Sequence, residues 1–354
     1  MVDHVSLRDF RSYAALELDL VPGLVVVIGR NGVGKTNLLE AIHVGSQGFS
    51  PRTRAEARLV RFGQDAARVS LSGEDRNVAV STQVTIAARD KRVLVNGAAA
   101  RGPDELRGRL ATLVFLPDRL AVVKGGPLVR RAYIDRMLGR VFPAQARLPS
   151  EYSRSLAQRN EALRHVRAGT STLEAVEPWT ARVAALGTEL DAVRAELVAS
   201  LTPGVEAAGE VLGLAKLALA YEPRPLTESQ LSERLERDVE RGLTGVGPHL
   251  RDVGIAAAGR ELRSFGSQGE QRVAVLALVL AEAGLSSESR GEPPLLLLDD
   301  VLSELDGQRR HALLDVLPAG GQTVITTTST DALPAGTRNA ALVVAVTPGK
   351  ARAA

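Results

Sequence analysis

The chain has 354 residues, 45% hydrophobic and 24% charged, a composition typical of a globular protein rather than a fibrous or disordered one. It contains no Cys, which excludes a disulfide scaffold, a thiolate metal site and a cysteine nucleophile. Lys and Arg number 44 against 41 Asp and Glu, so the net charge is only +3. The longest wholly apolar run, 273–281, is about half of the roughly 18–20 residues that a membrane-spanning helix needs, and the charged first ten residues do not resemble a secretory signal. We therefore expect a soluble, cytoplasmic protein with no membrane partner.

The first part of the chain is rich in predicted strands. Short apolar or alternating runs predict strands at 2–7, 15–20 and 24–28, and a helical pattern follows from about residue 35. Further antiparallel strands are predicted at 69–72, 78–86 and 92–96. The pair Asn96-Gly97 then predicts a tight turn.

The middle of the chain predicts two helices. From Trp179 to Leu197 apolar side chains recur with alternating gaps of four and three residues, which is the 3.5-residue period of a coiled-coil seam. The segment 152–166 has similar spacing, with Arg159 in one apolar position. We expect an antiparallel pair that forms a short stalk over about 150–201. Two packed helices within a helical domain are the alternative.

The last third returns to strands. Residues 222–225 and 242–259 are expected to be irregular, a helix follows Ser264, and strands are predicted at 295–298, 324–328 and 341–346, before a frayed tail at 348–354. Because strand-rich segments near both ends flank a helical insertion, a parallel sheet must combine segments distant in sequence. We expect a split α/β fold with an N-terminal lobe part at 1–115, a helical lobe at 116–245 and a C-terminal lobe part at 246–354.

A phosphate-binding loop follows the strand at 24–28. The segment from Gly29 to Thr36 fits G-x-x-x-x-G-K-[ST], between a strand and a helix as that motif requires. Its glycines let successive N–H groups point at phosphate oxygens, and the helix N-terminus adds positive charge. Lys35 would contact the β- and γ-phosphates and Thr36 would bind Mg²⁺. The expected ATP-binding residues are Gly29, Arg30, Asn31, Gly32, Val33, Gly34, Lys35, Thr36 and Asn37.

Two carboxylates end the apolar strand at 295–298. A strand buried on both faces delivers the side chains that follow it to the carboxyl edge of the sheet, where ligands bind in open α/β folds. Asp299 would hold the metal, and Asp300 would orient or deprotonate the attacking water. We therefore expect Lys35 and Asp300 as catalytic residues, and Thr36 and Asp299 as metal ligands.

A second anion site is predicted at the helix that follows Ser264. Ser267 and Glu270 have the spacing of a capping box, so the segment could be a helix start and nothing more. Ser267 and Gly269 also resemble the serine and a glycine of the signature segment of ABC-type ATPases, in which Gln268 and Glu270 are departures, and a helix N-terminus with a hydroxyl binds anions. One ATP does not need two phosphate sites from one chain. We therefore expect a head-to-tail homodimer in which this signature closes on the γ-phosphate held by the other copy.

These motifs resemble the ABC-type ATPases, and their order resembles the RecF family of bacterial recombination-repair proteins. The resemblance rests on the opening from Leu7 to Tyr13, on the stretch from Phe115 to Arg131 with its K-G-x-P-x-x-R-R ending, and on Gly247-Pro248-His249. After Asp300, the segment with Ser303 and Asp306 is similar to the D-loop. Asp300 stands where Glu is usual, so we expect slow hydrolysis. The resemblance implies an ABC/SMC-head-like P-loop fold with mixed sheets and a helical lobe with a coiled-coil stalk.

The resemblance also implies a function and partners. Members of the family bind duplex DNA and gapped or single-stranded junctions with ATP and Mg²⁺, act with RecO and RecR, and help load the RecA recombinase. A weak, DNA-stimulated ATPase that dimerises on DNA is the corresponding expectation for this chain.

DNA contacts are expected from two groups of arginines. Because five residues are Lys and 39 are Arg, an arginine cluster is weaker evidence for a nucleic-acid surface here than usual. Arginine contacts to phosphates would give salt-dependent, sequence-tolerant binding, and the aromatic content of 3% argues against a stacking platform for single strands. The expected contacts are Arg52, Arg54, Arg58, Arg61, Arg130 and Arg131.

Two other functions compete with DNA repair. A nucleotide-binding subunit of a transporter would need a surface for a membrane partner and a switch histidine near 326–328, where this chain has three Thr. A nucleotide-gated scaffold would have protein partners only. Gel shifts at several salt concentrations, with and without ATP, distinguish these functions.

Overall fold

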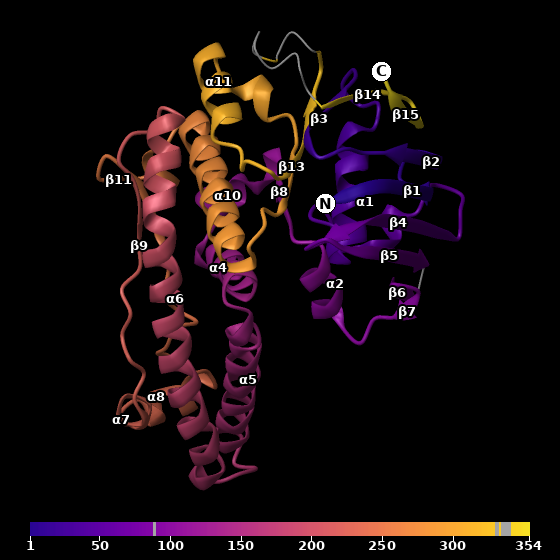
Figure 1. The fold of residues 1–354 in the computed structure, drawn as a ribbon. Coiled ribbons are helices and arrows are strands. Elements are labelled where there is room, and N and C mark those ends of the chain that lie inside the picture. Colours follow the sequence, from indigo (N-terminus) through magenta and orange to yellow (C-terminus); the bar gives the residue numbers. More distant parts are fainter. Residues whose placement is uncertain (88–89, 330–332, 334–340) are drawn as a thin grey trace. The chain divides into compact units, whose positions relative to one another are not determined.

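The computed structural model describes residues 1–87, 90–329, 333 and 341–354 (Figure 1). The described chain forms two compact units, one of Met1–Arg119, Val211–Gly213 and Val275–Ala354, and one of Leu120–Glu210 and Leu214–Ala274. Residues 246–274, expected in the ATPase lobe, are therefore compact with the helical unit. The division into functional lobes stays a prediction. Among the described helices, none is both long enough and apolar enough to cross a membrane.

An antiparallel sheet occupies much of the first unit. Its strands run in the order β2-β1-β4-β5-β6-β7. They are β1 (Val2–Phe10), β2 (Tyr13–Asp19), β4 (Ala66–Asp75), β5 (Val78–Ala87), β6 (Lys91–Val95) and β7 (Ala98–Ala99). Asn96 and Gly97 both have positive φ, 50° and 78°, so the predicted turn joins β6 to β7.

A second sheet of the first unit is almost entirely parallel, in the order β15-β14-β3-β13-β12-β8. It contains β3 (Gly23–Ile28), β8 (Thr112–Phe115), β12 (Leu295–Leu298), β13 (Gln322–Thr327), β14 (Leu342–Thr347) and β15 (Lys350–Ala353). The prediction of a sheet built from distant segments is confirmed. The expectation that residues 348–354 are frayed is wrong, because β15 pairs antiparallel with β14 and extends the sheet.

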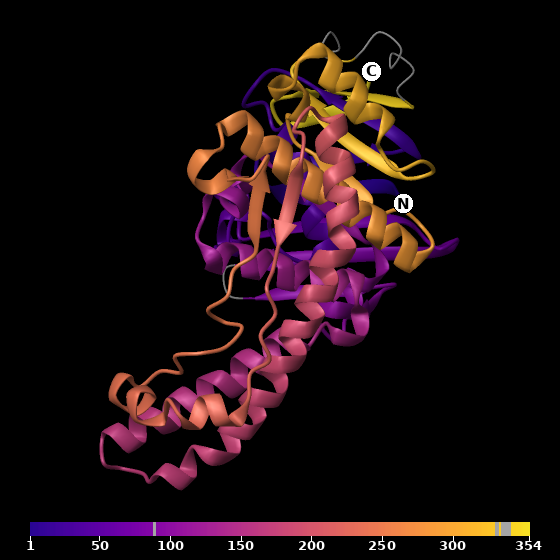
Figure 2. The same cartoon turned by 90° about the vertical axis from the view of Figure 1, so that its left-hand side faces the viewer.

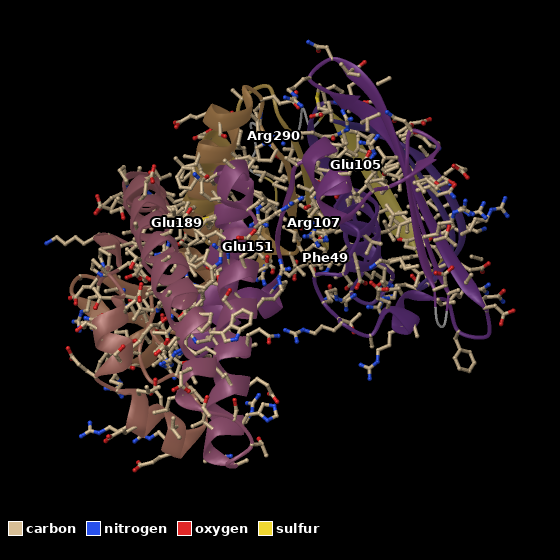
Figure 3. The ribbon with its side chains drawn as sticks, turned by 90° about the horizontal axis from the view of Figure 1, so that it is seen from below. Phe49, Glu105, Arg107, Glu151, Glu189 and Arg290 are labelled. Atoms are coloured by element: carbon tan, nitrogen blue, oxygen red, sulfur yellow. The ribbon has the colours of Figure 1, made fainter. Side chains whose placement is uncertain are left out.

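Helix α1 (Lys35–Gln47) lies between these two sheets. It contacts β4 and β5 of the antiparallel sheet and β8 and β13 of the parallel sheet, and Leu38, Leu39 and Ile42 are fully buried in the shared core. Helix α2 (Pro103–Arg109) packs against the end of α1, where the Arg107 guanidinium lies 5.2 Å from the centre of the Phe49 ring (Figure 3). The start of α1 lies near the carboxyl end of β3, because only residues 29–34 separate the two elements.

A long helix that begins in the second unit and several short elements complete the first unit. The apolar run 273–281 lies in helix α10 (Gln268–Arg290) and is buried throughout, which explains its hydrophobicity without a membrane. The short elements are the 3₁₀ helices η1 (Glu56–Leu59), η2 (Pro117–Leu120) and η5 (Val301–Glu304), and helix α11 (Gly307–Asp315).

The second unit is mainly helical. Its elements are α3 (Ala121–Lys124), α4 (Pro127–Val141), η3 (Pro143–Gln145), α5 (Leu148–Arg167), η4 (Leu173–Ala175), α6 (Glu177–Val211), α7 (Glu228–Ser232), α8 (Leu235–Arg241) and α9 (Leu262–Phe265). A small antiparallel sheet joins β9 (Leu217–Ala220), β10 (Gly254–Ala257) and β11 (Arg260–Glu261). Strand β10 corrects the expectation that 242–259 is irregular throughout.

Helices α5 and α6 run antiparallel, side by side (Figures 1 and 2). The expected seam on α6 is largely buried, with Val183, Leu190 and Leu197 at most 1% exposed. Arg159 interrupts the seam on α5 because its guanidinium is wholly buried and donates to Asp238 of α8 at 2.9 Å. Because α8 packs against α5, the α5–α6 pair is part of a larger helical unit in which a third helix contacts it.

Candidate nucleotide-binding site

The phosphate-binding loop runs between the carboxyl end of β3 and the first turn of α1. Gly34 precedes α1 with φ of 118°, a conformation that side chains with a Cβ rarely adopt. At Gly29 a Cβ would lie 2.5 Å from the Val346 carbonyl oxygen of the neighbouring strand. The two glycines are therefore required for different reasons, a left-handed turn and a close approach of two backbones.

Lys35 curls back over this loop. Its Nζ donates to the carbonyl oxygens of Gly29 at 2.6 Å and Arg30 at 3.1 Å, and the residue is only 7% exposed. Burial lowers the pKa of Lys35, and the charges of Asp300 and Asp299 oppose that shift. A partly desolvated ammonium held at the loop would interact strongly with a phosphate.

Asp299, which directly follows β12, links this strand to helix α1 and to strand β13. Its carboxylate accepts from Thr36 Oγ1 at 2.9 Å and from Thr326 Oγ1 at 2.7 Å. Strand β13, which carries Thr326, pairs with β3 on one side and β12 on the other, so the hydroxyl lies between the loop and the acidic strand. Burial raises the pKa of Asp299, and the bonds from Thr326 and Thr36 lower it in part.

Asp300 follows in a left-handed conformation, with φ of 48° and ψ of 28°. Asp tolerates this region better than most residues. Its backbone N–H donates to Thr326 Oγ1 at 2.9 Å, while its buried Oδ1 has no hydrogen-bond partner within the described residues. An unpartnered carboxylate oxygen can accept a hydrogen bond from a water molecule and so orient it, or can accept its proton.

The rest of the expected ATP-binding residues surround the same loop. Arg30, Asn31 and Gly32 are exposed, and Val33 is half-buried. Asn37 is tied to the protein by a hydrogen bond to Ser12 Oγ at 3.0 Å. The structure therefore brings Gly29–Asn37 together with Asp299 and Asp300, as expected from the sequence.

Thr326 is the residue that sequence reasoning missed at this site. The three threonines at 326–328 were noted only where a transporter carries a histidine, yet Thr326 is fully buried and bonded to both acidic residues. The signal was available: a strand that must lie between β3 and β12 ends in a hydroxyl side chain.

The signature segment opens α10 in the second unit. Ser267 N donates to Glu270 Oε2 at 2.7 Å, and Glu270 N donates to Ser267 Oγ at 3.2 Å, so the capping box is formed and Glu270 faces its own helix. The hydrogen bonds from Ser267 lower the pKa of Glu270. Ser267, Gln268 and Gly269 are all exposed, so this helix start is accessible to a ligand.

The D-loop residues have structural partners. Ser303 Oγ donates to the Asp300 carbonyl oxygen at 2.9 Å and so supports the left-handed turn. Asp306 caps α11 by accepting from Arg309 N at 2.9 Å. Both residues therefore shape the chain directly after the acidic strand.

The arginines expected to contact DNA have different environments. Arg130 is 3% exposed, and its guanidinium pairs with Asp252 and donates to two carbonyl oxygens. This corrects the expectation for Arg130, because a buried, paired guanidinium cannot reach a phosphate backbone. Arg131 donates to the Arg251 carbonyl oxygen at 2.7 Å.

In the first group, Arg52 donates to buried Glu40 at 3.0 Å, and Arg61 pairs with Asp9 at 3.3 Å. Burial alone would raise the pKa of Glu40, but hydrogen bonds from Arg11 and Ser50 outweigh it and lower the pKa. Arg54 and Arg58 are exposed, and their guanidinium groups have no partner within the described residues.

The segment Gly247-Pro248-His249 supports the second unit. His249 is linked to the Tyr152 hydroxyl at 2.7 Å and to the Thr244 carbonyl oxygen at 3.0 Å, and Arg194 donates to the Pro248 carbonyl oxygen at 2.9 Å. Burial lowers the pKa of His249 and thus favours the neutral ring. This segment joins α5 and α6 by polar contacts.

The comparisons with known proteins agree with this geometry. Residues 1–350 match the family model described as the RecF/RecN/SMC N terminal domain. The chain is 37% identical to the DNA replication and repair protein RecF of Moorella thermoacetica, over 94% of this chain and 91% of that protein. It is similar to a solved structure of the recombination mediator protein RecF with ATP, with a TM-score of 0.88 and 26% identity over 100% of this chain and 97% of that one.

An Smc head domain from Pyrococcus furiosus shares the fold alone, with a TM-score of 0.63 and 17% identity over 100% of this chain and 95% of that one. The fold is thus that of the ABC-type ATPases with an SMC-like head, as expected. The phosphate loop, the acidic strand and the whole-length similarity lead to one assignment. The chain belongs to the RecF family.

Proposed function

We propose that this chain binds Mg·ATP at the loop Gly29–Asn37, dimerises head-to-tail around it, and binds DNA in recombinational gap repair in the cytoplasm. The observation that carries the proposal is the pair of hydrogen bonds that Thr36 and Thr326 make to Asp299. They join the phosphate loop to the acidic strand. The names of the relatives, which refer to DNA replication and repair and to ATP, support the same function.

The donor set fits Mg²⁺. Mg²⁺ prefers oxygen ligands and usually binds through one or two carboxylates, waters and substrate phosphates. Asp299 and Thr36 offer a carboxylate and a hydroxyl side by side. Across the described residues, no group of three or more His, Asp or Glu side chains is placed to hold a metal ion.

Each residue then has a defined task. Mg²⁺ supplies charge neutralisation for the β- and γ-phosphates when it is bound. Lys35 exchanges its two carbonyl partners for phosphate oxygens, and the N–H groups before α1 face the same anion. Asp300 orients the attacking water and accepts its proton through Oδ1. An Asp side chain is one methylene shorter than Glu, so we propose weak, slow ATP hydrolysis, stimulated by DNA.

The dimer explains the second anion site. Ser267 and the N-terminus of α10 are exposed, although one nucleotide needs only one phosphate loop. We propose that Ser267, Gln268 and Gly269 contact the γ-phosphate bound by another copy. DNA, and mediators of the RecO and RecR type, would then act on the closed dimer, which would help load a RecA-type recombinase.

Sedimentation with ATP, ADP or no nucleotide tests this function. We expect a dimer with Mg·ATP, and a monomer with ADP or without nucleotide. Lys35→Met should abolish ATP binding, whereas Ser267→Arg should leave ATP binding by the monomer intact and prevent dimerisation. A Ser267→Arg protein that dimerises normally with ATP would show that the shared site is wrong.

DNA binding is tested separately by gel shift at several salt concentrations, with and without ATP. Affinity for duplex DNA should fall with salt and change with ATP. A protein indifferent to both would be a nucleotide-gated scaffold with protein partners only, and the repair function would fail.

A further inference from the structure

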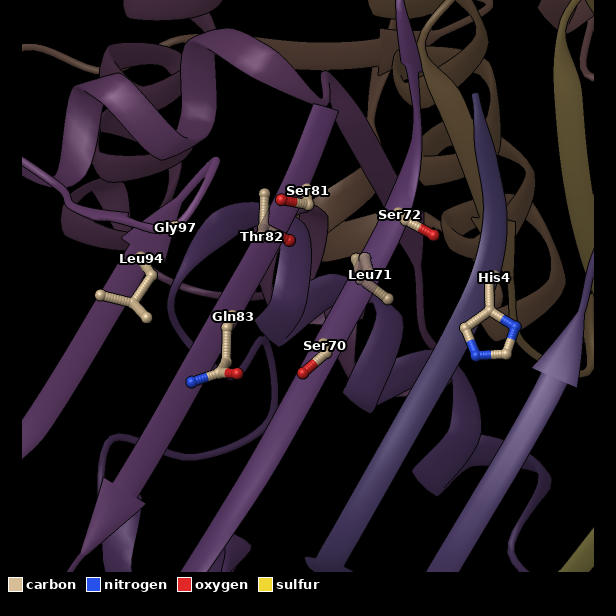
Figure 4. A pocket seen from close by; sticks show the side chains of 9 residues that line it. All are labelled: His4, Ser70, Leu71, Ser72, Ser81, Thr82, Gln83, Leu94 and Gly97. Atoms are coloured by element: carbon tan, nitrogen blue, oxygen red, sulfur yellow. The ribbon is translucent and has the colours of Figure 1, made fainter. Parts of the chain in front are cut away.

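The antiparallel sheet of the first unit has one open face. Along β4 and β5, alternate residues such as Val69, Leu71 and Val84 are buried in the core with α1. The intervening residues lie on the opposite face. Figure 4 looks at this face across β6, β5, β4 and β1, where polar and apolar residues together line a hollow of about 230 Å³.

A row of arginines crosses this face beside the hollow. In the strand register Arg8 of β1 lies opposite Arg68 of β4, Arg68 lies opposite Thr85 of β5, and Thr85 lies opposite Arg92 of β6. Residues directly opposite in neighbouring strands point to the same face of a sheet. All three arginines are exposed. We call Arg8, Arg68 and Arg92 the arginine row.

The charge of this row is poorly neutralised by the protein. Like charges directly opposite each other destabilise a sheet. The guanidinium groups of Arg68 and Arg92 have no hydrogen bond or ion pair within the part of the chain that the structure describes. Arg8 lies near Glu17, but that carboxylate is already hydrogen-bonded to His4 and Ser6. A fold that keeps this repulsion on an open surface favours an external anion.

The surroundings of the row suit phosphate oxygens. Beside Leu71 and Leu94, the lining of the hollow includes Ser70, Ser72, Ser81 and Gln83, whose hydroxyl and amide groups can donate hydrogen bonds to such oxygens. Two acidic residues on this face, Glu17 and Asp19, lie on edge strand β2 and pair with His4. A third, exposed Glu74, lies on β4 beyond Ser72, six residues along the strand from Arg68. These carboxylates lie toward the border of the face, away from the row itself.

We infer that the arginine row and its adjoining serines bind the phosphate backbone of duplex DNA. The inference rests on the proposed DNA-repair function and names a surface for it. The row crosses three strand spacings, about 14 Å, over which one strand of a duplex presents about four phosphates. An acidic protein fits less well, because the row and its serines include none of the exposed large hydrophobic side chains that anchor protein interfaces.

The experiment compares two double variants in the full chain. Arg68→Thr with Arg92→Thr removes two charges and keeps strand-favouring residues. Arg237→Gln with Arg241→Gln is the control, because these arginines are exposed on α8 of the second unit. Anisotropy of a labelled 20-base-pair duplex is measured at 50, 100 and 200 mM salt with Mg·ATP, alongside ATP binding.

The row variant should bind the duplex at least tenfold more weakly, and the slope of log affinity against log salt should be shallower by about 1.8, since each phosphate contact contributes about 0.9. Its ATP affinity and the DNA binding of the control should not change. If the row variant keeps the wild-type affinity and slope, the inference is wrong and the proposed function stands.

Two further outcomes would also overturn the inference. If the wild-type protein itself shows no salt-dependent duplex binding, the proposed function fails and this surface fails with it. The second outcome concerns poly-glutamate of matched charge as a competitor. If it displaces the labelled duplex from the wild type as effectively as unlabelled duplex does, but fails to displace it from the row variant, the surface recognises an acidic protein instead.

Discussion

Replacing Thr326 with Val should weaken Mg·ATP binding although Thr326 would not touch the nucleotide. Val has nearly the same shape and suits a buried strand, so the change removes the hydroxyl and little else. Two hydrogen bonds are lost, one donated to Asp299 at 2.7 Å and one accepted from Asp300 N at 2.9 Å. Asp299 would lose the partner that holds its carboxylate toward Thr36.

The magnitude follows from the type of bond that is removed. A hydrogen bond to a charged group contributes about 1.5–3 kcal/mol, and the removal of a residue that orients a metal ligand typically weakens metal affinity about 10- to 100-fold. The Thr326 bond lowers the pKa of Asp299, so its loss raises that pKa further above the ordinary value. A larger fraction of Asp299 is then protonated at acidic pH. The loss of affinity should therefore be greatest at low pH and shrink as the pH rises.

Binding of a fluorescent ATP analogue, titrated with Mg²⁺ from pH 5.5 to 8.5, measures this effect. Thr323→Val is the matched control, because Thr323 is also buried on β13 but has no side-chain hydrogen bond within the described residues. Equal Mg²⁺ affinities and pH profiles for Thr326→Val, Thr323→Val and the wild type would refute the role assigned to Thr326.

Three other substitutions test the site and the helical unit. Asp300→Asn keeps the left-handed turn but removes the proton acceptor, so single-turnover hydrolysis should fall about 10²- to 10⁴-fold with ATP binding intact; an unchanged rate would exclude Asp300 as the base. Gly29→Ala should abolish ATP binding in equilibrium dialysis, because its Cβ would collide with a main-chain oxygen at 2.5 Å. Arg159→Leu leaves buried Asp238 without its cation and should cost about 3–5 kcal/mol in urea unfolding followed by the single tryptophan, whereas exposed Arg154→Leu should cost little.

Motifs that are contiguous in sequence were predicted well. The loop Gly29–Thr36, the strand that ends in Asp299 and the capping box of Ser267 with Glu270 each depend on residues within a few positions of one another. Their geometry follows from local backbone conformation, helix capping and strand burial. The parallel sheet was also predictable in kind, because two buried strands with ligand-binding ends lie far apart in the chain.

Side-chain partners across strands and helices were not predictable in this way. Arg130 has the sequence context of a surface cluster, yet its fold buries it against Asp252. The tail was expected to fray, yet β15 gains a partner in β14. Both outcomes depend on which distant segment lies alongside, and a single sequence does not specify that neighbour.

The sequence by itself therefore determined the chemistry of this protein: a loop that cradles phosphates and a strand that presents two carboxylates. Only the tertiary structure decided that Thr326 joins them and that Arg8, Arg68 and Arg92 form one row. The physical reason is the pairing register of strands. Hydrogen-bonded strands about 4.8 Å apart bring residues that are tens to hundreds of positions distant onto one edge or one face of a sheet.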